Sequence, residues 1–309
     1  MSSTAGKHEP QVSMSQSQND KFDPPLVIIG AARSGTNMLR DLLCSLEPFA
    51  TWPCDEIQYV WRHGNREFAT DEFTAEMADP KTIAFIRKQF AKFAKMHPGK
   101  QIIEKTCANT LRCEFVQRVL PEAKFVHIIR DGRDVAASAS IRWNAGLDLE
   151  YLFKKARYVP MGDVPYYASR YLGSHFYRLT AGKKRLSTWG PKFSGMSQAF
   201  AENDLPVGCA IQWKTCVSSA IEQLSRLDQS NVMTVRYEEA TANPALTLTN
   251  ICQFVGTDVD AAAIEALTSR VSKKSVGKWK SQLTDSQVEG IEEKAGDLLN
   301  QLGYIGAVV

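Results

Sequence analysis

The sequence predicts an α/β fold in which helices flank a parallel β-sheet. Four short apolar segments of the kind that forms buried strands recur along the 309 residues, and apolar residues at helical spacing lie between them. This alternation is typical of parallel strands joined by right-handed crossovers. Hydrophobic residues make up 44% and charged residues 23% of the chain, which is average for a folded globular protein and excludes a largely disordered one.

The first unit of the alternation is a strand, a tight turn and a helix. The run LVII at 26–29 is apolar throughout, as a strand buried on both faces requires. Leucine and methionine then recur at helical spacing over 38–46. The preceding residues 1–23 are rich in serine, glutamine and charge, so we expect a disordered tail there.

Three later strands and four later helices complete the prediction. Strands are expected at 102–103, 125–129 and 232–235. Helices are expected where apolar residues recur every three to four positions, at 114–120, 134–143, 209–227 and 285–302. The sequence therefore predicts a single domain over residues 24–309.

Residues 144–208 do not fit the alternation and are interpreted as an insertion. Six of the nine tyrosines lie there, and the segment 142–193 holds ten Lys or Arg against three acids. Aromatic faces next to basic side chains suit an anionic ligand. We interpret this helical, aromatic insertion as a substrate-binding segment or lid.

The sequence lacks a signal or membrane segment and lacks CxxC pairs, and these two features predict the location of the protein and the state of its cysteines. The N-terminal segment lacks the apolar core of a secretory signal, and the chain has no apolar run of about 18 or more residues. The seven cysteines are scattered and form no CxxC pair, which favours reduced thiols over disulfides or zinc. We therefore expect a cytoplasmic protein without a transmembrane segment.

The turn after the first strand has the spacing of a phosphate-binding loop. Gly30 and Gly35 enclose four residues, and a turn between strand and helix offers backbone amides to an anion. A nucleoside triphosphatase continues with lysine and then Ser or Thr, which reach the phosphates and Mg²⁺. This chain has Thr36 and Asn37 there, and its cation is Arg33 inside the loop. A ligand with one bridging phosphate and no metal fits better than ATP with Mg²⁺.

A second anion site is predicted at the end of the strand 125–129. Arg130 stands at the strand end, and Asp134, Ser138 and Arg142 follow at four-residue intervals on one helical face. Arginine and hydroxyl donors there can fix the oxygens of a dianion. With the strand–helix alternation, the loop spacing predicts a three-layer sandwich like that of P-loop nucleoside triphosphatases.

At these residues the sequence resembles the sulfotransferases that use 3′-phosphoadenosine 5′-phosphosulfate (PAPS), especially the branch of tyrosylprotein sulfotransferases and many bacterial enzymes. The resemblance covers residues 24–143 and 210–305, and its motifs are GAARSGTNML, IIEKT, FVHIIRDGRDVAASASIR, VRYEE and SVGKW. It implies transfer of the PAPS sulfuryl group to an acceptor hydroxyl. The product would be adenosine 3′,5′-bisphosphate (PAP), and no metal would take part.

The resemblance also implies which residues bind PAPS. It assigns the 5′ side to Arg33, Ser34, Gly35, Thr36 and Asn37. It assigns the 3′-phosphate to Arg130, Ser138 and Arg142, and the rest of the nucleotide site to Tyr237, Ser275, Gly277 and Lys278.

Three residues are predicted to be catalytic. Arg33 and Lys105 are the cations expected at the leaving phosphate and the transferring sulfuryl group. Glu56 is the predicted base, because the resembling enzymes carry a catalytic glutamate just after the first helix. Asp55 is an alternative base or the cap of the following helix. His63, seven residues after Glu56 on the same predicted helical face, is the second alternative base.

The predicted acceptor is a hydroxyl of a carbohydrate or a small molecule. The basic and aromatic insertion 144–208 favours an anionic glycan, whereas no nucleic-acid-binding motif accompanies it. Two other functions stay open. A P-loop kinase would use ATP and depend on Mg²⁺, and a non-catalytic nucleotide-binding module would hold PAPS without transferring its sulfuryl group.

Overall fold

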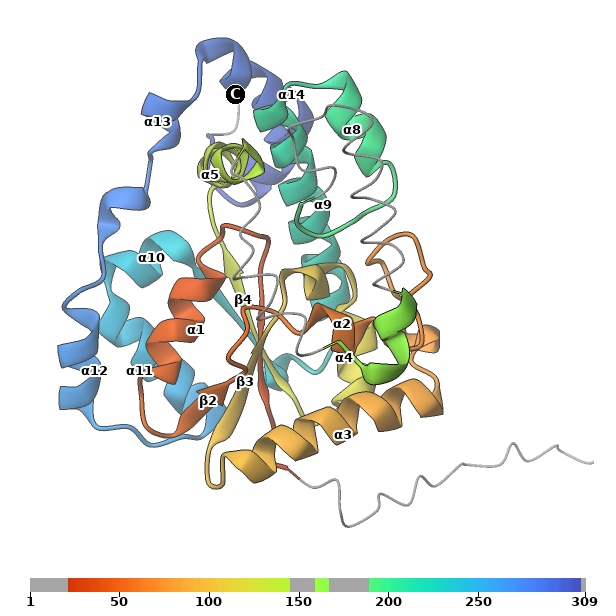
Figure 1. Cartoon of the computed structure of the whole chain (residues 1–309). Helices are drawn as coiled ribbons and strands as arrows, with labels where there is room; N and C mark the ends of the chain where they lie inside the picture. Colours follow the sequence, from red (N-terminus) through yellow and green to blue (C-terminus); the bar gives the residue numbers. More distant parts are fainter. Residues whose placement is uncertain (1–21, 145–158, 167–188, 307–309) are drawn as a thin grey trace, which may run out of the picture.

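A five-stranded parallel sheet forms the centre of the molecule (Figure 1). The computed structural model describes residues 22–144, 159–166 and 189–306. The strand order is β2-β3-β1-β4-β5. The strands are β1 (Leu26–Ile29), β2 (Phe49–Thr51), β3 (Gln101–Lys105), β4 (Lys124–Ile129) and β5 (Val232–Arg236). The predicted α/β class with a parallel sheet is confirmed.

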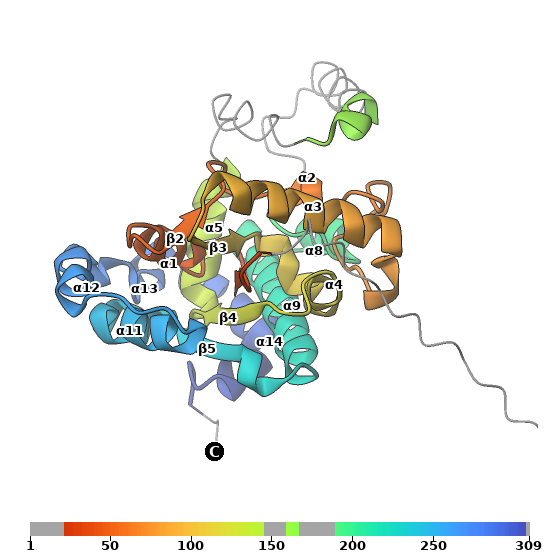
Figure 2. The ribbon, with the colours of Figure 1, turned by 90° about the horizontal axis from the view of Figure 1, so that it is seen from below.

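Helices cover both faces of this sheet (Figures 1 and 2). One face carries α1 (Thr36–Cys44), α10 (Tyr237–Ala242), α11 (Pro244–Val255) and α12 (Ala261–Thr268). The other carries α3 (Pro80–Met96), α4 (Cys113–Val119) and α9 (Leu205–Ser225). Helices α5 (Gly132–Asn144) and α14 (Asp285–Gln301) pack against α9. The sheet between two helical layers is the predicted three-layer sandwich.

Short elements fill the connections. They are the helices α2 (Gln58–Trp61), α8 (Met196–Glu202) and α13 (Trp279–Gln282), and the 3₁₀ turns Ala75–Met77, Cys107–Leu111, Met161–Asp163, Gln229–Asn231 and Lys273–Ser275. No helix in the described part of the chain is both long enough and apolar enough to span a membrane.

The position of β1 explains its uniformly apolar sequence. Leu26 and Ile28 enter the core beneath α1 and α11, whereas Val27 and Ile29 enter the core beneath α3 and α4. All four side chains are fully buried. A strand between two helical layers has no solvent-facing side, so a polar residue at any position would lose its hydration.

The pairing of β3 with β1 determines which charged residue reaches the phosphate loop. Lys105 pairs with Ile28 at the end of both strands, beside the loop that follows β1. Successive side chains of a strand point to opposite faces, so Glu104 points away from Lys105. The buried Glu104 carboxylate accepts hydrogen bonds from Trp61 Nε1 at 3.0 Å and Asn109 Nδ2 at 2.9 Å.

Several elements were not predicted from the sequence, among them β2 and the helices α3, α10, α11 and α12. Strand β2 has only three residues, which is too few for a periodic pattern to show. Helix α3 does carry start signals, because Pro80 is its first residue and the Asp79 side chain caps it by accepting from the Thr82 amide at 2.7 Å.

Two predicted regions fall partly outside the described residues. Of the predicted tail at 1–23, residues 1–21 lie outside them. Of the predicted insertion at 144–208, residues 145–158 and 167–188 lie outside them. Its last residues begin α9 at Leu205, four positions before the predicted helix start.

Candidate active site

The loop between β1 and α1 has the geometry of an anion cradle. Gly35 precedes α1 with a φ of 95°, and a Cβ atom there would lie 2.3 Å from the Tyr237 ring. Arg33 has a φ of 74°, which no other non-glycine residue in the described ranges approaches. Ser34 is fully buried, and its hydroxyl has no hydrogen-bond partner among the described residues. A buried, unpartnered hydroxyl beside a helix N-terminus suits a bound anion.

Three arginines gather beside this loop. Arg130 Nη1 donates to the carbonyl oxygen of Arg33 at 3.0 Å, and Arg33 Nε donates to the Ser138 hydroxyl at 2.9 Å. Burial and the charges of Arg130 and Arg142 lower the pKa of Arg33. A bound anion would relieve this mutual repulsion, so the residues predicted for the 3′-phosphate form a cationic group next to the loop.

The other predicted nucleotide residues lie around Arg130. Its guanidinium is 4.4 Å from the centroid of the Tyr237 ring and donates a hydrogen bond to the Ser275 carbonyl. The Asp134 carboxylate accepts from the Gly277 amide at 2.8 Å and lies 3.6 Å from the guanidinium of Arg130. Buried Asp134 also accepts from the Trp279 amide at 2.9 Å and therefore anchors the segment 277–279 beside α5.

Three of the predicted binding residues are exposed: Arg33 in the loop, and two more at its rim. Asn37, in the first turn of α1, is exposed, and so is Lys278, next to Gly277. Their side chains can reach a nucleotide only from the solvent side of the loop.

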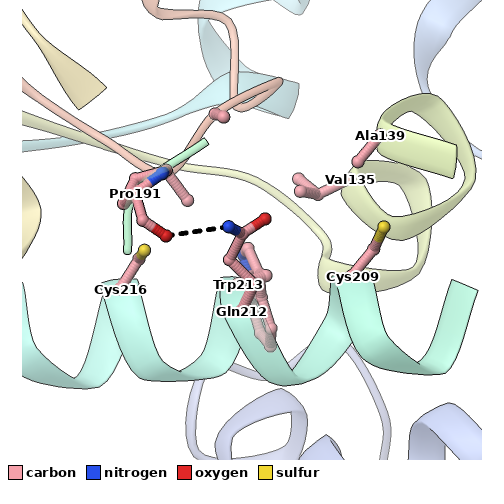
Figure 3. A pocket seen from close by; sticks show the side chains of 9 residues that line it. Val135, Ala139, Pro191, Cys209, Gln212, Trp213 and Cys216 are labelled. Carbon is pink, nitrogen blue, oxygen red and sulfur yellow. Dashed lines mark hydrogen bonds between the residues drawn. The ribbon is translucent and has the colours of Figure 1, made fainter. Parts of the chain in front are cut away.

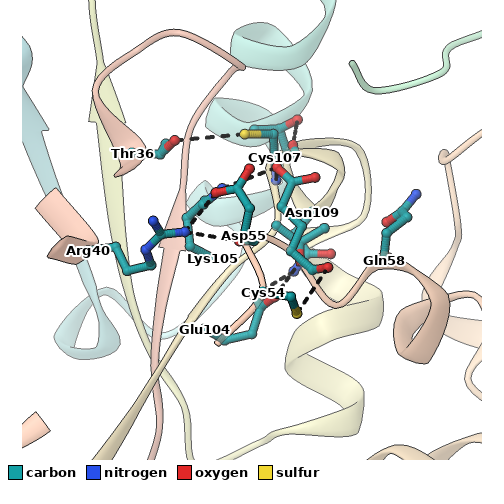
Figure 4. A network of polar contacts seen from close by, with 12 residues as sticks. Thr36, Arg40, Cys54, Asp55, Gln58, Glu104, Lys105, Cys107 and Asn109 are labelled. Carbon is teal, nitrogen blue, oxygen red and sulfur yellow. Dashed lines mark hydrogen bonds and ion pairs between the residues drawn. The ribbon is translucent and has the colours of Figure 1, made fainter. Parts of the chain in front are cut away.

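The predicted catalytic lysine and carboxylates meet at the end of β3 (Figure 4). Lys105 Nζ lies 2.8 Å from Asp55 Oδ1 and 3.3 Å from Glu56 Oε1. Glu56 Oε1 also accepts from the Cys107 amide at 3.1 Å, and the Cys107 Sγ is 3.8 Å from the Thr36 hydroxyl. This cluster therefore adjoins the first turn of α1, directly after the phosphate loop.

Burial and opposite charges determine the protonation of this cluster. Lys105 is only 3% exposed, and its burial alone would lower its pKa. The nearby Glu56 and Asp55 carboxylates outweigh burial and raise the pKa of Lys105. Burial alone would raise the pKa of Asp55, but Lys105 and Arg40 outweigh it and hold this pKa well below its ordinary value. Asp55 is therefore a poor proton acceptor, and Glu56 remains the predicted base.

Two expectations for this region are wrong: the helix cap at Asp55, and the shared helical face of Glu56 and His63. Asp55 does not cap the next helix, because Ile57 is the residue before α2 and Asp55 pairs with cations instead. Helix α2 contains neither Glu56 nor His63, so these two do not share a helical face. The His63 ring Nδ1 lies 2.8 Å from Asp163 Oδ2, in the described part of the insertion.

Arg33 and Lys105, the two predicted catalytic cations, contact different residues. The Arg33 side chain reaches Ser138 on α5, whereas Lys105 pairs with the carboxylates at the end of β3. The phosphate loop connects the two groups, because Arg33 lies in it and Thr36 follows it.

Sequence reasoning missed Arg40 and the role of Asp134. Arg40 Nη1 donates to Asp55 Oδ1 at 2.7 Å. The position of Arg40 in the sequence could have indicated its place near the site, because a residue four after Thr36 lies on the same side of α1 as the end of the loop. The same four-residue rule placed Asp134 on the face of Ser138, but it did not show that Asp134 binds the backbone of a segment distant in sequence.

A pocket lies beside the loop on the side of α9 (Figure 3). Ala31 and Ala32 of the loop line it, together with small or apolar side chains of α5 and α9. Its polar residue Gln212 donates to the Pro191 carbonyl at 2.9 Å. None of the predicted site residues lines this pocket, so it is not one of the two phosphate sites.

One family model matches this chain in sequence, and solved structures match it in fold. The model of the sulfotransferase family matches residues 24–186 and 176–261. Among solved structures, the sulfotransferase domain from the curacin biosynthetic pathway is 12% identical, with a TM-score of 0.52 over 89% of this chain and 98% of that one. Sulfotransferase STF9 from Mycobacterium avium is 11% identical, with a TM-score of 0.51 over 91% of this chain and 77% of that one. Comparison with curated proteins gave no significant match.

Proposed function

The chain belongs to the sulfotransferase family, and on this premise we propose that it moves the sulfuryl group of PAPS to an acceptor hydroxyl. The observation that carries the proposal is the placement of two charged groups around one loop. A cationic group contains Arg33, Arg130 and Arg142, and a mixed group contains Lys105 and two carboxylates. The first suits a phosphate, and the second suits a reaction that needs both a cation and a base.

The residues of the first group fit a nucleotide with phosphates at both ends. The loop amides and the unpartnered hydroxyl of Ser34 would hold the 5′ side, and Arg130 and Ser138 would hold the 3′-phosphate. The Nε atom of Arg130 is buried without a hydrogen-bond partner among the described residues, which supports a ligand oxygen there. Tyr237, packed against Gly35 and Arg130, would complete the site.

The residues of the second group supply the chemistry of transfer. PAPS provides an activated sulfuryl group, whose bond to the phosphate oxygen breaks as the acceptor oxygen bonds to sulfur. Glu56 would take the acceptor proton. Lys105 and Arg33 would stabilise the negative charge on the transferring group and on the leaving phosphate.

The proposed acceptor is a hydroxyl of a carbohydrate or a small molecule, with an anionic glycan favoured by the basic insertion. Contacts of the described part of the insertion support a place for the insertion near Glu56. Asp163 contacts His63 Nδ1 at 2.8 Å and Arg66 Nη1 at 2.6 Å, directly after α2. The insertion therefore reaches the segment that follows Glu56. The seven cysteines are all free thiols, which supports a proposed location in the reducing cytoplasm.

Calorimetry with two nucleotides tests the proposal. We expect PAP to bind without a metal, and ATP to bind weakly whether or not Mg²⁺ is present. Radiolabelled PAPS would then be offered with a panel of glycans, phenols and sterols to identify the acceptor. Tight, Mg²⁺-dependent ATP binding without PAP binding would instead support a kinase. PAP binding without transfer to any acceptor would support a non-catalytic module.

The Ser138→Ala variant is expected to weaken PAP binding about tenfold or more, because it removes a hydroxyl donor to a charged phosphate. The loss should appear in the Kd measured by calorimetry. Ser140→Ala is the matched control, because Ser140 lies on the same helix but its hydroxyl donates to the Ala136 carbonyl at 2.7 Å. An unchanged Kd in Ser138→Ala would count against the 3′-phosphate site.

A further inference from the structure

The turn that carries Asp55 and Glu56 is held by an arginine of the helix after the phosphate loop. Arg40 Nη1 donates to the Asp55 carbonyl oxygen at 3.1 Å and to Asp55 Oδ1 at 2.7 Å (Figure 4). Its Nε and Nη2 donate to Asp41 Oδ1 at 2.8 and 2.7 Å, which orients the guanidinium along α1. The Arg40 side chain is only 13% exposed. Arg40 therefore binds the backbone and the carboxylate of the turn at once.

This turn depends on side-chain contacts for its position. Residues 52–57 lie between β2 and α2, outside any helix or strand. Arg40 binds the turn from α1, and Lys105 binds it from β3. The Cys107 amide adds a hydrogen bond to Glu56 from the 3₁₀ turn after β3. Each of these contacts ties the two carboxylates to an element that borders the phosphate loop.

Arg40 also balances charge in the buried cluster. Asp55 and Glu56 both contact Lys105, so without Arg40 two carboxylates would share one lysine. Arg40 adds a second cation beside Asp55, although the exposed Asp41 shares its guanidinium. Lys105 is then not the sole counter-charge of Asp55, and its ammonium group can also serve a substrate anion.

We propose that Arg40 is a positioning residue that fastens the Asp55–Glu56 turn to the helix of the phosphate loop and takes up the charge of Asp55. Lys105 and Glu56 are thereby held in place for the transferring group. Arg40 acts through Asp55, because its guanidinium donates to Asp55 and Asp41. The inference rests on the proposed sulfotransferase function for its catalytic consequence, but not for its structural one.

Hydrogen exchange tests the structural consequence without any substrate. In Arg40→Gln, we expect amide exchange over residues 52–57 to become at least about tenfold faster, because the turn loses its anchor on α1. Arg40→Lys keeps the charge and should restore part of the protection. Unchanged exchange over 52–57 in Arg40→Gln would overturn the proposal.

Arg87→Gln is the matched control for this change. Arg87 has the same side-chain exposure of 13%, and its Nη1 likewise donates to a backbone carbonyl and a carboxylate, those of Val119 and Glu122. Helix α3 packs against the turn through Phe90 and Phe93, which contact Trp52, but the Arg87 guanidinium itself contacts Val119, Glu122 and the Phe22 ring. Exchange over 52–57 should therefore match that of the unmodified protein. Equal acceleration in both variants would indicate general loosening and would overturn the proposal.

Kinetics test the catalytic consequence. Arg40→Gln should lower kcat about tenfold or more, since a misplaced base and lysine lose the reactive geometry, while the Kd for PAP changes less than about twofold. The double variant Arg40→Gln/Asp55→Asn should be no slower than Asp55→Asn, because Arg40 acts through Asp55. Losses that multiply in the double variant, or a loss confined to PAP binding, would overturn the proposal. Failure of the unmodified protein to bind PAP would count against the proposed function alone, because hydrogen exchange still decides the role of Arg40.

Discussion

Replacing Glu56 by alanine is expected to lower the rate of sulfuryl transfer by roughly two or more orders of magnitude in a protein that stays folded and still binds PAP. Glu56 lies 3.3 Å from Lys105 Nζ and accepts the Cys107 amide at 3.1 Å, so its carboxylate is fixed beside the proposed sulfuryl position. Without Glu56, no positioned base takes the proton from the acceptor hydroxyl. Single-turnover assays with radiolabelled PAPS and the true acceptor would measure the loss.

A matched pair of variants shows whether Glu56 or Asp55 is the base. Both carboxylates contact Lys105, but the pKa of Asp55 is held far below its ordinary value by Lys105 and Arg40 despite its burial. Asp55→Asn should therefore cost less than Glu56→Ala. A larger loss in Asp55→Asn would move the role of base to Asp55, and near-native turnover in Glu56→Ala would refute its assignment.

Replacing Arg33 by alanine is expected to reduce transfer by a similar factor, roughly two or more orders of magnitude. Arg33 is the cation inside the phosphate loop, and it also donates to the Ser138 hydroxyl at 2.9 Å. Its loss should therefore weaken PAP binding and slow the chemical step together. Calorimetry and single-turnover rates measured on the same protein would separate the two effects.

The control for this variant is an arginine outside the site. Arg118, exposed at the end of α4, should tolerate alanine without a change in PAP binding or rate. Alanine and arginine are both unfavourable at a positive φ, so the Arg33→Ala variant removes the side chain without relieving the backbone strain at this position. A rate near that of the unmodified protein in Arg33→Ala would remove Arg33 from the catalytic residues.

The strand pattern is clearest in the sequence where a helical layer lies on each side of the strand. The edge strand β5 was also predicted, although its Thr234 is exposed. Strands β1 and β4 are apolar at almost every position because neither has a solvent-facing side, and their pattern is visible in the sequence. Strand β2 has three residues, and its place beside β3 depends on pairing with a distant segment. Pairing of that kind leaves no local pattern.

The same distinction applies to the site. The phosphate loop and the spacing of Ser138 and Arg142 are local patterns, so they could be predicted before the structure. The positions of Asp55 and His63 depend on where α2 begins, and Asp55 looks like a helix cap in the sequence. In the fold its carboxylate pairs with Lys105 and Arg40 instead, since burying it without cations would cost more than leaving the helix uncapped. The roles of these residues in the reaction stay predictions.

Because Glu104 and Lys105 alternate along β3, the alignment of this strand decides which charge faces the proposed reaction centre. If β3 slid by one residue against β1, a carboxylate would occupy the place of the ammonium group, and the centre would repel the sulfate it should attract. Hydrogen-bonded neighbours on both edges, β1 and β2, oppose such a slip. Insertions or deletions engineered into β3 would therefore invert the local field even where every charged residue was kept.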